Sequence, residues 1–452
     1  MGGERIRTSS IVIMHYESGY LASQNKWRRF VKAHFSQIGD TARSAHTPFC
    51  ASVWGGMSTD AVIDRVHKIK EADIPAEYIW MDAGWYGTSV LPSPDEFEGD
   101  WYNYTGDWRI NEAHHPDKMQ DVVAAIKKSG KKFLLWFEPE RVINTTPIAA
   151  EHPDYFISSP RENDKNLLLN LGDENAWRYC YDLLAEKIET LRIDCYRQDF
   201  NFPPLCFWQK NDAADRKGIT EIKYIMGLYR LWDALLTRFP HLVIDNCASG
   251  GRRIDIETLR RSVPLWRSDV QCHANHTVES AQMQSLGYGL WMPYSATGTG
   301  RITGDTYRLR SAYSPGLVMM YSFAERDAYG ETEEELQWYK KHADEFLRLR
   351  PYFTEDIHPL TEPSWAKDAW CAMQYHKPSE NDGMLLLFRR EALPYTHAAF
   401  ALHALDADKD YVFTDIDTSA RFTHSGKSLL ASGFPVEMQE ARTAKIFVYT
   451  PK

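Results

Sequence analysis

The stretch RIDCYRQDFN (192–201) decides the fold prediction, because a strand-like run ends directly in the carboxylate of Asp199. The run PLWRSD (264–269) has the same form and ends in Asp269. Parallel strands of a barrel deliver such strand-closing residues to one mouth. Two carboxylates at that mouth are the minimal equipment for cleaving a glycosidic bond, because one can attack the sugar while the other protonates the leaving oxygen.

Short apolar runs alternate with longer amphipathic segments on both sides of this stretch, from about residue 49 to 350. This alternation is the pattern of repeated β-α units. Eight units predict an α/β fold, a (β/α)8 TIM barrel with its active site at the C-terminal ends of the strands. The strand candidates are FCASVW (49–54), YIWMD (78–82), KFLLWF (132–137), RIDCYRQD (192–199), LVIDN (242–246), PLWRSD (264–269), YGLWM (288–292) and LVMMY (317–321).

Two helix candidates between these strands have clear signals. Thr332 to Arg348 opens with acidic residues, ends in basic ones and is expected to stop before Pro351, as the helix dipole and proline stereochemistry favour. Ser58 to Lys70 begins with a capping serine, and its apolar residues recur at helical spacing: Val62, Val66 and Ile69.

The chain divides into three predicted parts. Residues 1–48 form a lead-in, with a strand at SIVIMHY and a helix at LASQNKWRRFVKAHF, and residues 49–350 form the catalytic barrel. Alternating runs in residues 351–452 predict a C-terminal antiparallel β-sandwich domain. Its strand candidates are AWCAMQYH (369–376), GMLLLFRR (383–390), HAAFALHAL (397–405), DYVFTDID (410–417) and AKIFVYT (444–450).

Composition and charge exclude several partners. The 452 residues include 52 basic and 62 acidic side chains, and the net charge of −10 disfavours nucleic acid and anionic membranes. No apolar stretch approaches the roughly 20 residues that span a bilayer, and the start MGGERIRTSS lacks a signal peptide's apolar region. The seven cysteines lack CxxC spacing, which favours a reducing, cytoplasmic compartment.

A long connection follows the second predicted strand, at residues 83–116, and is rich in aromatic residues. Connections of this length in a barrel are usually functional. Trp85, Trp101 and Trp108 can wall a sugar pocket or pack the loop onto the barrel rim, and the sequence leaves both open. His114 and His115 lack further ligands at metal-binding spacing, so we expect no metal and no cofactor.

Seven motifs occur along the predicted barrel: YIWMDAGWYG (78–87), GDW (106–108), LLWFEPERV (134–142), HPD (152–154), RQDFN (197–201), DNCASGGRRID (245–255) and WRSD (266–269). Together, and in this order, they resemble the catalytic region of the retaining α-galactosidases of glycoside hydrolase family 36, the melibiase family. The resemblance implies the barrel fold, an oligosaccharide or glycoside substrate, Asp199 as nucleophile and Asp269 as general acid/base. It implies substrate contacts for Asp82, Trp85, Trp136, Glu138, Arg197, Asn201, Cys247, Gly250, Gly251 and Trp266.

The residues agree with this division of roles. Arg197 lies two positions before Asp199 on the same strand face, where its charge can keep the nucleophile ionised. Asp269 follows Trp266, and partial desolvation there would raise its pKa enough to hold a proton. Glu138 can bind sugar or order the exit of its strand, and the sequence leaves these two roles open.

The chain departs from the family pattern at three places. Arg197 stands where the family has lysine, and Ala83 replaces the second of two consecutive aspartates that grip the sugar's 4- and 6-hydroxyls. Losing such a charge-assisted acceptor costs about 1.5–3 kcal/mol, enough to alter sugar preference. The large N-terminal β-sandwich usual in the family does not precede the barrel in this sequence, which weakens any oligomer prediction, although a homo-oligomer is compatible with it.

The sequence therefore predicts a retaining exo-α-glycosidase that acts on α-galactosides or a related galacto-configured sugar by double displacement. Ala83 suggests a sugar altered at one gripped position, such as a 6-deoxy, pentose or sulfated residue. A transglycosylase resembling raffinose synthases, and a catalytically silent carbohydrate-binding protein, are the alternatives.

Overall fold

The computed structural model describes residue 3 and residues 6–17, 19–39, 43–90, 99–272, 276–301, 304–320 and 332–452. The chain splits into two compact units, each described here by itself. The first comprises Met1–Ile13, Phe35–Asp269 and Val318–Lys340, and the second comprises Met14–His34, Val270–Leu317 and Lys341–Lys452.

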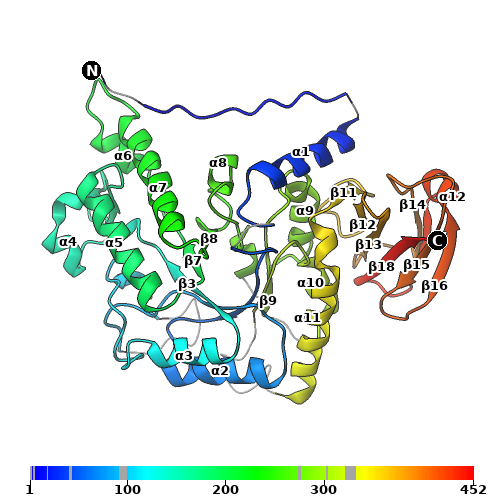
Figure 1. The fold of residues 1–452 in the computed structure, drawn as a ribbon, viewed down its shortest axis with the longest axis horizontal. Helices are drawn as coiled ribbons and strands as arrows, with labels where there is room; N and C mark the ends of the chain where they lie inside the picture. Colours follow the sequence, from blue (N-terminus) through cyan, green and yellow to red (C-terminus); the bar gives the residue numbers. More distant parts are fainter. Residues whose placement is uncertain are drawn as a thin grey trace. The chain divides into compact units, whose positions relative to one another are not determined.

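A parallel sheet forms the centre of the first unit (Figure 1). Six of its strands lie in the order β8 (Val243–Asn246), β7 (Cys195–Gln198), β3 (Lys132–Phe137), β2 (Tyr78–Met81), β1 (Phe49–Val53) and β10 (Leu317–Met320). The first five pair in parallel with their neighbours, and their residues are almost all buried, as expected of a sheet covered on both faces.

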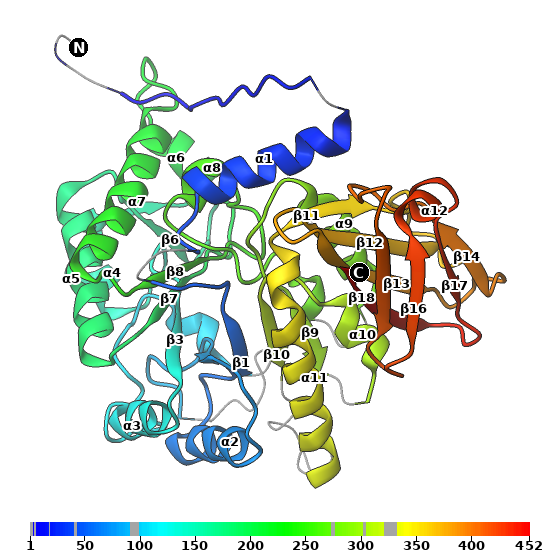
Figure 2. The same ribbon diagram turned by 45° about the vertical axis from the view of Figure 1, so that its right-hand side comes forward.

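Helices follow these strands as the β-α pattern predicts. Helices α2 (Thr59–Glu71) and α3 (Gln120–Lys128) lie side by side, as do α5 (Glu174–Thr190) and α7 (Ile219–Arg238) (Figures 1 and 2). The predicted capping of α2 is confirmed, because the Ser58 side chain accepts a hydrogen bond from the backbone N–H of Ala61. Its apolar residues Val62, Val66 and Ile69 are all buried.

Shorter elements fill the connections of the first unit. An antiparallel three-stranded sheet has the order β4 (Arg141–Ile143), β6 (Asn166–Leu169) and β5 (Phe156–Ser158). The remaining helices are η1 (Trp101–Tyr104), α4 (Pro147–Glu151), η2 (Pro153–Tyr155), α6 (Leu205–Asn211) and α8 (Ile256–Leu259).

The predicted strand at 264–269 is wrong as a regular strand. Only Val263 makes a parallel bridge, to Asp245 of β8. Pro264 has no N–H to donate to a sheet, and the N–H of Leu265 donates instead to the Asp245 carboxylate at 2.8 Å. The segment therefore leaves the ladder and carries Asp269 into the 3-10 helix η3 (Asp269–Cys272).

The predicted strand at 288–292 is also wrong. These residues form the 3-10 helix η4 (Tyr288–Leu290) directly after α9 (Glu279–Gly287), because a short apolar run does not distinguish strand from helix. The second unit instead contains β9 (Gly298–Arg301), whose sequence GTGR has no apolar pattern, and α10 (Thr306–Ser311).

Helix α11 (Glu333–Phe353) continues past the predicted stop and has Pro351 inside it. The proline lies in the last turn, where its missing N–H removes a single backbone hydrogen bond.

The C-terminal β-domain contains all five predicted strands in antiparallel sheets (Figure 2). The predicted run 397–405 forms a strand only at its start, and β11, β16 and β17 were missed. The larger sheet has the order β11 (Asp356–Pro359), β12 (Trp370–Lys377), β13 (Asp382–Arg389), β18 (Thr443–Pro451), β15 (Asp410–Asp415) and β16 (Arg421–Ser425). The others are β14 (His397–Phe400), its partner β17 (Phe434–Glu437), and helix α12 (Gly426–Ala431).

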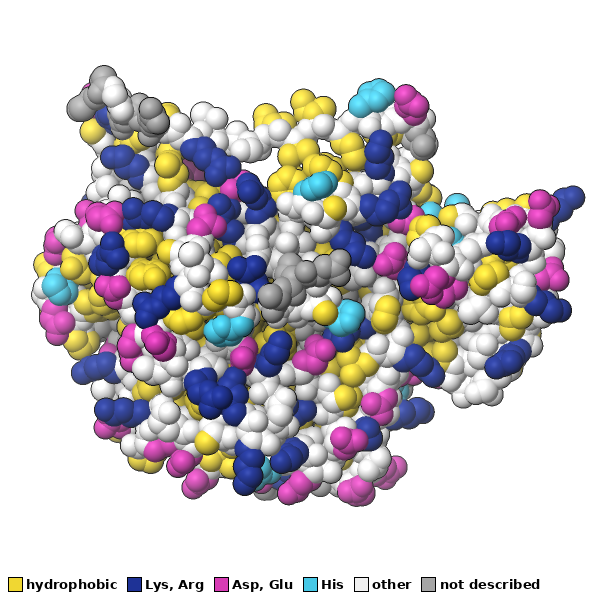
Figure 3. All heavy atoms as spheres, viewed as in Figure 1, with side chains coloured by type: hydrophobic (Ala, Val, Ile, Leu, Met, Phe, Trp, Pro, Cys, Tyr) yellow, Lys and Arg dark blue, Asp and Glu magenta, His cyan; other side chains and the backbone are white. Residues whose placement is uncertain are grey.

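The predicted fold class, an α/β barrel followed by an antiparallel β-domain, is confirmed, whereas the domain boundaries at residues 49 and 351 stay predictions. Acidic and basic side chains are interspersed on the face drawn in Figure 3. Within the described ranges, no helix is long and apolar enough to cross a membrane.

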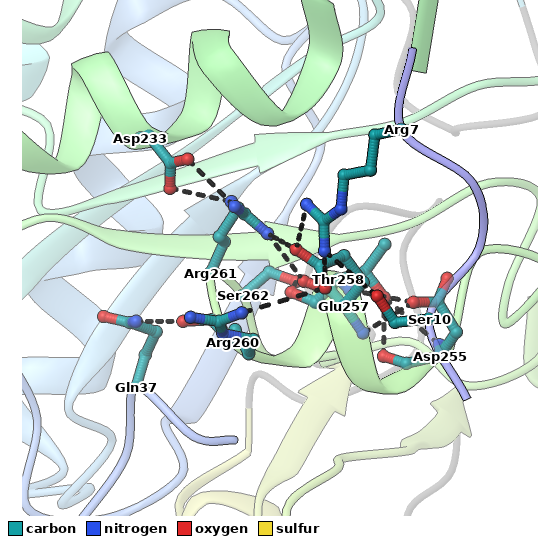
Figure 4. A network of polar contacts seen from close by, with 10 residues as sticks. All are labelled: Arg7, Ser10, Gln37, Asp233, Asp255, Glu257, Thr258, Arg260, Arg261 and Ser262. Carbon is teal, nitrogen blue, oxygen red and sulfur yellow. Dashed lines mark hydrogen bonds and ion pairs between the residues drawn. The ribbon is translucent and has the colours of Figure 1, made fainter. Parts of the chain in front are cut away.

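The lead-in differs from its prediction at SIVIMHY, which forms no strand, whereas the predicted helix is present as α1 (Tyr20–His34). The part of the lead-in that belongs to the first unit is bound to α8 by an ion pair (Figure 4). Arg7 donates to both carboxylate oxygens of Glu257 on α8, at 3.1 and 2.8 Å, and Arg261 joins Glu257 to Asp233.

A buried histidine in the second unit makes stability depend on pH. His358 on β11 is only 6 % exposed, and neither ring nitrogen has a hydrogen-bond partner among the residues that the structure describes. Burial, and then the neighbouring His403, His376 and Arg29, lower its pKa to about 3. The unfolded chain therefore binds a proton more readily than the folded one, so folding stability is fully present above pH about 6.5 and is lost as pH falls.

We expect His358→Phe to flatten the acid side of the stability profile. The free energy of unfolding would be measured by urea titration between pH 7 and 5. Its decrease per pH unit should be smaller in His358→Phe than in the wild type, by up to about 1.4 kcal/mol. His67→Phe, at an exposed position of α2, is the matched control and should keep the wild-type slope. An unchanged slope in His358→Phe would contradict the prediction.

Candidate active site

Asp199 directly follows β7 and is almost fully buried, with 7 % of its surface exposed. Four N–H groups converge on its carboxylate. Oδ1 accepts from the backbone N–H of Phe200 at 2.7 Å and of Ser249 at 3.2 Å. Oδ2 accepts from Asn201 Nδ2 at 2.9 Å and from Trp136 Nε1 at 3.1 Å. This carboxylate is therefore bound as an anion.

The surroundings of Asp199 favour its ionised form. Burial alone would raise the pKa of the carboxyl, but the charge of Arg197 and the donors Asn201 and Trp136 outweigh burial and lower the pKa below its ordinary value. The predicted effect of Arg197 on Asp199 is present in the structure. A low pKa supplies the anion that a nucleophile needs.

Arg197 is a buried cation between two further carboxylates. Its guanidinium stacks on the Trp80 ring, with Cζ 4.2 Å from the ring centroid, and donates to Asp245. Its Nε lies 3.5 Å from Asp82 Oδ2, which also accepts from Trp80 Nε1 at 2.7 Å. Burial raises the pKa of both Asp82 and Asp245, and the charge of Arg197 lowers it in part. Arg197 thus links three carboxylates that come from β2, β7 and β8 of the parallel sheet.

Asp269 has the opposite electrostatic setting from Asp199. It begins η3 and is partly exposed. Burial, followed by the negative charge of Asp199, raises the pKa of the Asp269 carboxyl, while Arg197 and Arg252 oppose the shift. The direction agrees with the sequence prediction, and the repulsion by Asp199 is a cause that the sequence did not show. A raised pKa lets Asp269 hold a proton that it can donate.

The predicted aromatic residues occupy different places. Trp85 is 0 % exposed and donates its Nε1 to the Trp136 backbone carbonyl at 2.9 Å, so it packs inside the rim with Trp108. Trp136 donates a hydrogen bond to Asp199. Trp101 lies edge-on to Trp136, with 5.7 Å between the two ring centroids. Trp266 lies edge-on to Trp80 at 5.8 Å. The part of the aromatic loop at 91–98 lies outside the described residues.

Glu138 binds Asn201, the residue whose side-chain amide donates to Asp199. It is 0 % exposed, and its Oε1 accepts from the Asn201 backbone N–H at 2.6 Å. Its Oε2 accepts from Asn201 Nδ2 at 3.2 Å and from Arg141 at 2.6 Å. The sequence left two roles open for Glu138, sugar binding and ordering of the segment that follows its strand. These contacts favour the second role. Arg253 donates to both carboxylate oxygens of Glu140, at 2.7 and 3.1 Å, whereas Arg252 Nε donates to the Ala248 carbonyl oxygen.

The loop at 247–251 approaches the segment that carries Asp269. Gly250 has φ +80°, and a Cβ there would lie 2.8 Å from Ser268 Cα. A Cβ on Gly251 would lie 2.7 Å from the Arg267 carbonyl oxygen. Both glycines are thus required by a close approach of two backbones. Buried Cys247 accepts a hydrogen bond from the Gly250 N–H at 3.4 Å.

Sequence reasoning missed several residues of this site: Trp80, Arg141, Asp245 and Ser249. Asp245 carries a usable signal, since it lies in the strand-ending run LVIDN beside Asn246. Ser249 carries none, because its role depends on a left-handed backbone with φ +48°. Among the residues that the structure describes, no group of three or more His, Cys, Asp or Glu side chains is arranged to hold a metal ion.

Curated relatives are similar over most of the chain. The α-galactosidase 1 of Pediococcus pentosaceus is 21 % identical over 85 % of this chain and 52 % of its own length. The α-galactosidase AgaA of Geobacillus stearothermophilus is 24 % identical over 90 % of this chain and 55 % of its own. The chain therefore spans about half the length of the curated relatives it matches.

Solved structures share the fold. A variant of the family 36 α-galactosidase AgaA from Geobacillus stearothermophilus, in complex with stachyose, has a TM-score of 0.80 at 19 % identity, over 96 % of this chain and 59 % of that one. The α-galactosidase from Lactobacillus brevis has a TM-score of 0.78 at 19 % identity, over 95 % and 58 %. The family model described as melibiase matches residues 6–351, more than half of the sequence. The chain therefore belongs to the melibiase family of glycoside hydrolases.

Proposed function

We propose that the chain is a retaining exo-α-glycosidase that hydrolyses terminal α-galactosides or a related galacto-configured sugar. The opposed electrostatic settings of Asp199 and Asp269 carry this proposal. The Asp199 carboxyl has a lowered pKa and the Asp269 carboxyl a raised pKa, and the negative charge of Asp199 is one cause of the raised pKa of Asp269. Two carboxyls whose pKa values are shifted in opposite directions can supply an ionised nucleophile and a protonated acid at the same pH.

The reaction proceeds in two displacements. Asp199 attacks the anomeric carbon while Asp269 donates its proton to the leaving glycosidic oxygen. Asp269 is then an anion and can take a proton from the incoming water, whose oxygen displaces Asp199. Two inversions retain the α configuration. The chemistry needs no group beyond these carboxyls, and Arg197 stabilises the negative charge that alternates between them.

The names of the relatives support a galacto-configured sugar. A variant of the Geobacillus stearothermophilus relative AgaA, named as an α-galactosidase, has been solved in complex with stachyose. The Asp82 side chain is 22 % exposed, which supports a role in accepting hydrogen bonds from sugar hydroxyls. Ala83 beside it is 1 % exposed and has no polar side chain. In this proposal Asp82 is the one recognition carboxylate of the pair, and Ala83 offers only a methyl group.

A panel of 4-nitrophenyl glycosides tests the sugar class. We expect the highest kcat/KM on the α-galactoside or on its 6-deoxy or pentose analogue, because one hydroxyl grip is missing at Ala83. The α-glucoside should be poor, since it differs in configuration at the 4-position. Preference for the α-glucoside would contradict the proposal, whereas clear preference for unmodified α-galactoside would remove the idea of an altered sugar.

Replacement of the nucleophile should abolish turnover. Asp199→Ala should lower kcat by more than about a thousandfold, since no covalent intermediate can form. Thermal unfolding followed by circular dichroism should show that the barrel remains folded. Asp60→Asn, at an exposed position of α2, is the control and should keep full activity. Retained activity in Asp199→Ala would mean that another group attacks.

The pH profile should be bell-shaped. Activity needs ionised Asp199 and is lost as pH falls through its lowered pKa, and it needs protonated Asp269 and is lost as pH rises through its raised pKa. Asp269→Asn should therefore remove the alkaline fall in kcat/KM. The variant should also lose more activity on alkyl glycosides than on nitrophenyl glycosides, whose leaving group needs little protonation. Equal losses on both substrates would count against Asp269 as the acid.

A further inference from the structure

Ser249 holds the side-chain amide that touches the proposed nucleophile. Its Oγ lies 2.9 Å from Asn201 Oδ1 and 2.8 Å from a terminal nitrogen of Arg252. Its backbone N–H donates to Asp199 Oδ1 at 3.2 Å. One residue therefore contacts both the carboxylate and the amide that binds the other oxygen of that carboxylate.

The direction of each hydrogen bond in this chain is fixed by chemistry. A guanidinium can only donate, so Ser249 Oγ must accept from Arg252. The single O–H of Ser249 is then free to donate to Asn201 Oδ1. The amide nitrogen of Asn201 must in turn face the two carboxylates, Asp199 at 2.9 Å and Glu138 at 3.2 Å. The reverse amide orientation would point a carbonyl oxygen at two anions.

Arg252 is itself held in place, which makes it a firm origin for the chain of donors. Its Nε donates to the Ala248 carbonyl oxygen at 2.8 Å, and its terminal nitrogen also reaches the Phe200 carbonyl oxygen at 3.2 Å. Hydrogen bonds in such a chain polarise one another, so the positive charge of Arg252 strengthens the last donor. That last donor is the Asn201 amide on Asp199 Oδ2.

We propose that Ser249 is a positioning residue. Its hydroxyl is the middle link of a chain in which Arg252 donates to Ser249, Ser249 donates to Asn201 and Asn201 donates to Asp199, and this chain keeps the proposed nucleophile ionised and oriented. This inference rests on the proposed role of Asp199. The effect of this donor chain adds to that of the other charged groups facing Asp199: Arg197, Arg141, Arg253, Asp82, Asp245, Glu138 and Asp269.

The left-handed backbone of Ser249 determines which variants isolate the hydroxyl. Ser249→Ala removes the hydroxyl and keeps the N–H, but alanine is also strained at φ +48°. Ser249→Gly removes the hydroxyl and relieves that strain. Ser419→Ala is the matched control, because Ser419 has φ +61° and lies on the exposed surface of the C-terminal domain. An effect shared by the two Ser249 variants and absent from the control belongs to the hydroxyl.

The experiment measures the ionisation of Asp199 directly. In the 452-residue chain labelled with carboxyl-13C aspartate, the Asp199 signal is the one missing from Asp199→Asn, and its chemical shift is followed against pH. We expect Asp199 to titrate at higher pH in both Ser249 variants than in the wild type. The acid limb of kcat/KM on 4-nitrophenyl α-galactoside should move the same way, with activity near neutral pH reduced about tenfold by loss of one orienting hydrogen bond.

Unchanged titration of Asp199 in Ser249→Ala and Ser249→Gly would overturn the inference, even if their activity fell. A wild-type protein that releases no nitrophenol from any glycoside of the panel would overturn the proposed function instead. In that case a shifted Asp199 titration would still support the donor chain. Ser419→Ala should match the wild type in both measurements.

Discussion

The buried guanidinium of Arg197 is the interaction on which the site depends. It stacks on Trp80, donates to Asp245 and lies beside Asp82, while its charge also lowers the pKa of Asp199. Each of these carboxylates would be costly to ionise in a buried pocket without a cation. The partners come from the ends of β2, β7 and β8, so the parallel sheet gathers them around one charge. Arginine suits this position, because a planar fork can stack and donate at once.

The same arrangement places the carboxyls of Asp199 and Asp269 in different environments. Asp199 is deeply buried yet receives four N–H donors, whereas Asp269 lies partly exposed beyond the end of the sheet. Pro264 contributes to this difference, because it ends the ladder after Val263 and allows the following segment to leave the sheet. Gly250 and Gly251 then permit that segment to pass close to the loop whose Ser249 N–H donates to Asp199. Backbone geometry and electrostatics thus both contribute to the different environments of Asp199 and Asp269.

Much of the fold could be predicted, because strands buried on both faces are short apolar runs and the helices between them are amphipathic. The runs at 132–137 and 242–246 became β3 and β8 almost residue for residue. The failures have local causes. GTGR (298–301) has no apolar signal, and YGLWM (288–292) reads equally well as strand or helix. Within the site, Arg197 and Asp199 follow from strand periodicity, but the roles of Ser249 and Glu138 depend on loops that only the folded chain brings together.

The most direct test of the central claim is to trap the glycosyl-enzyme. The protein would be incubated with a 2-deoxy-2-fluoro-α-galactosyl substrate bearing a good leaving group, digested, and examined by mass spectrometry. We predict one added fluorosugar on the peptide that contains Asp199, and none in Asp199→Ala. An adduct on a different carboxylate, or rapid turnover with an inverted first product and no adduct, would contradict attack by Asp199.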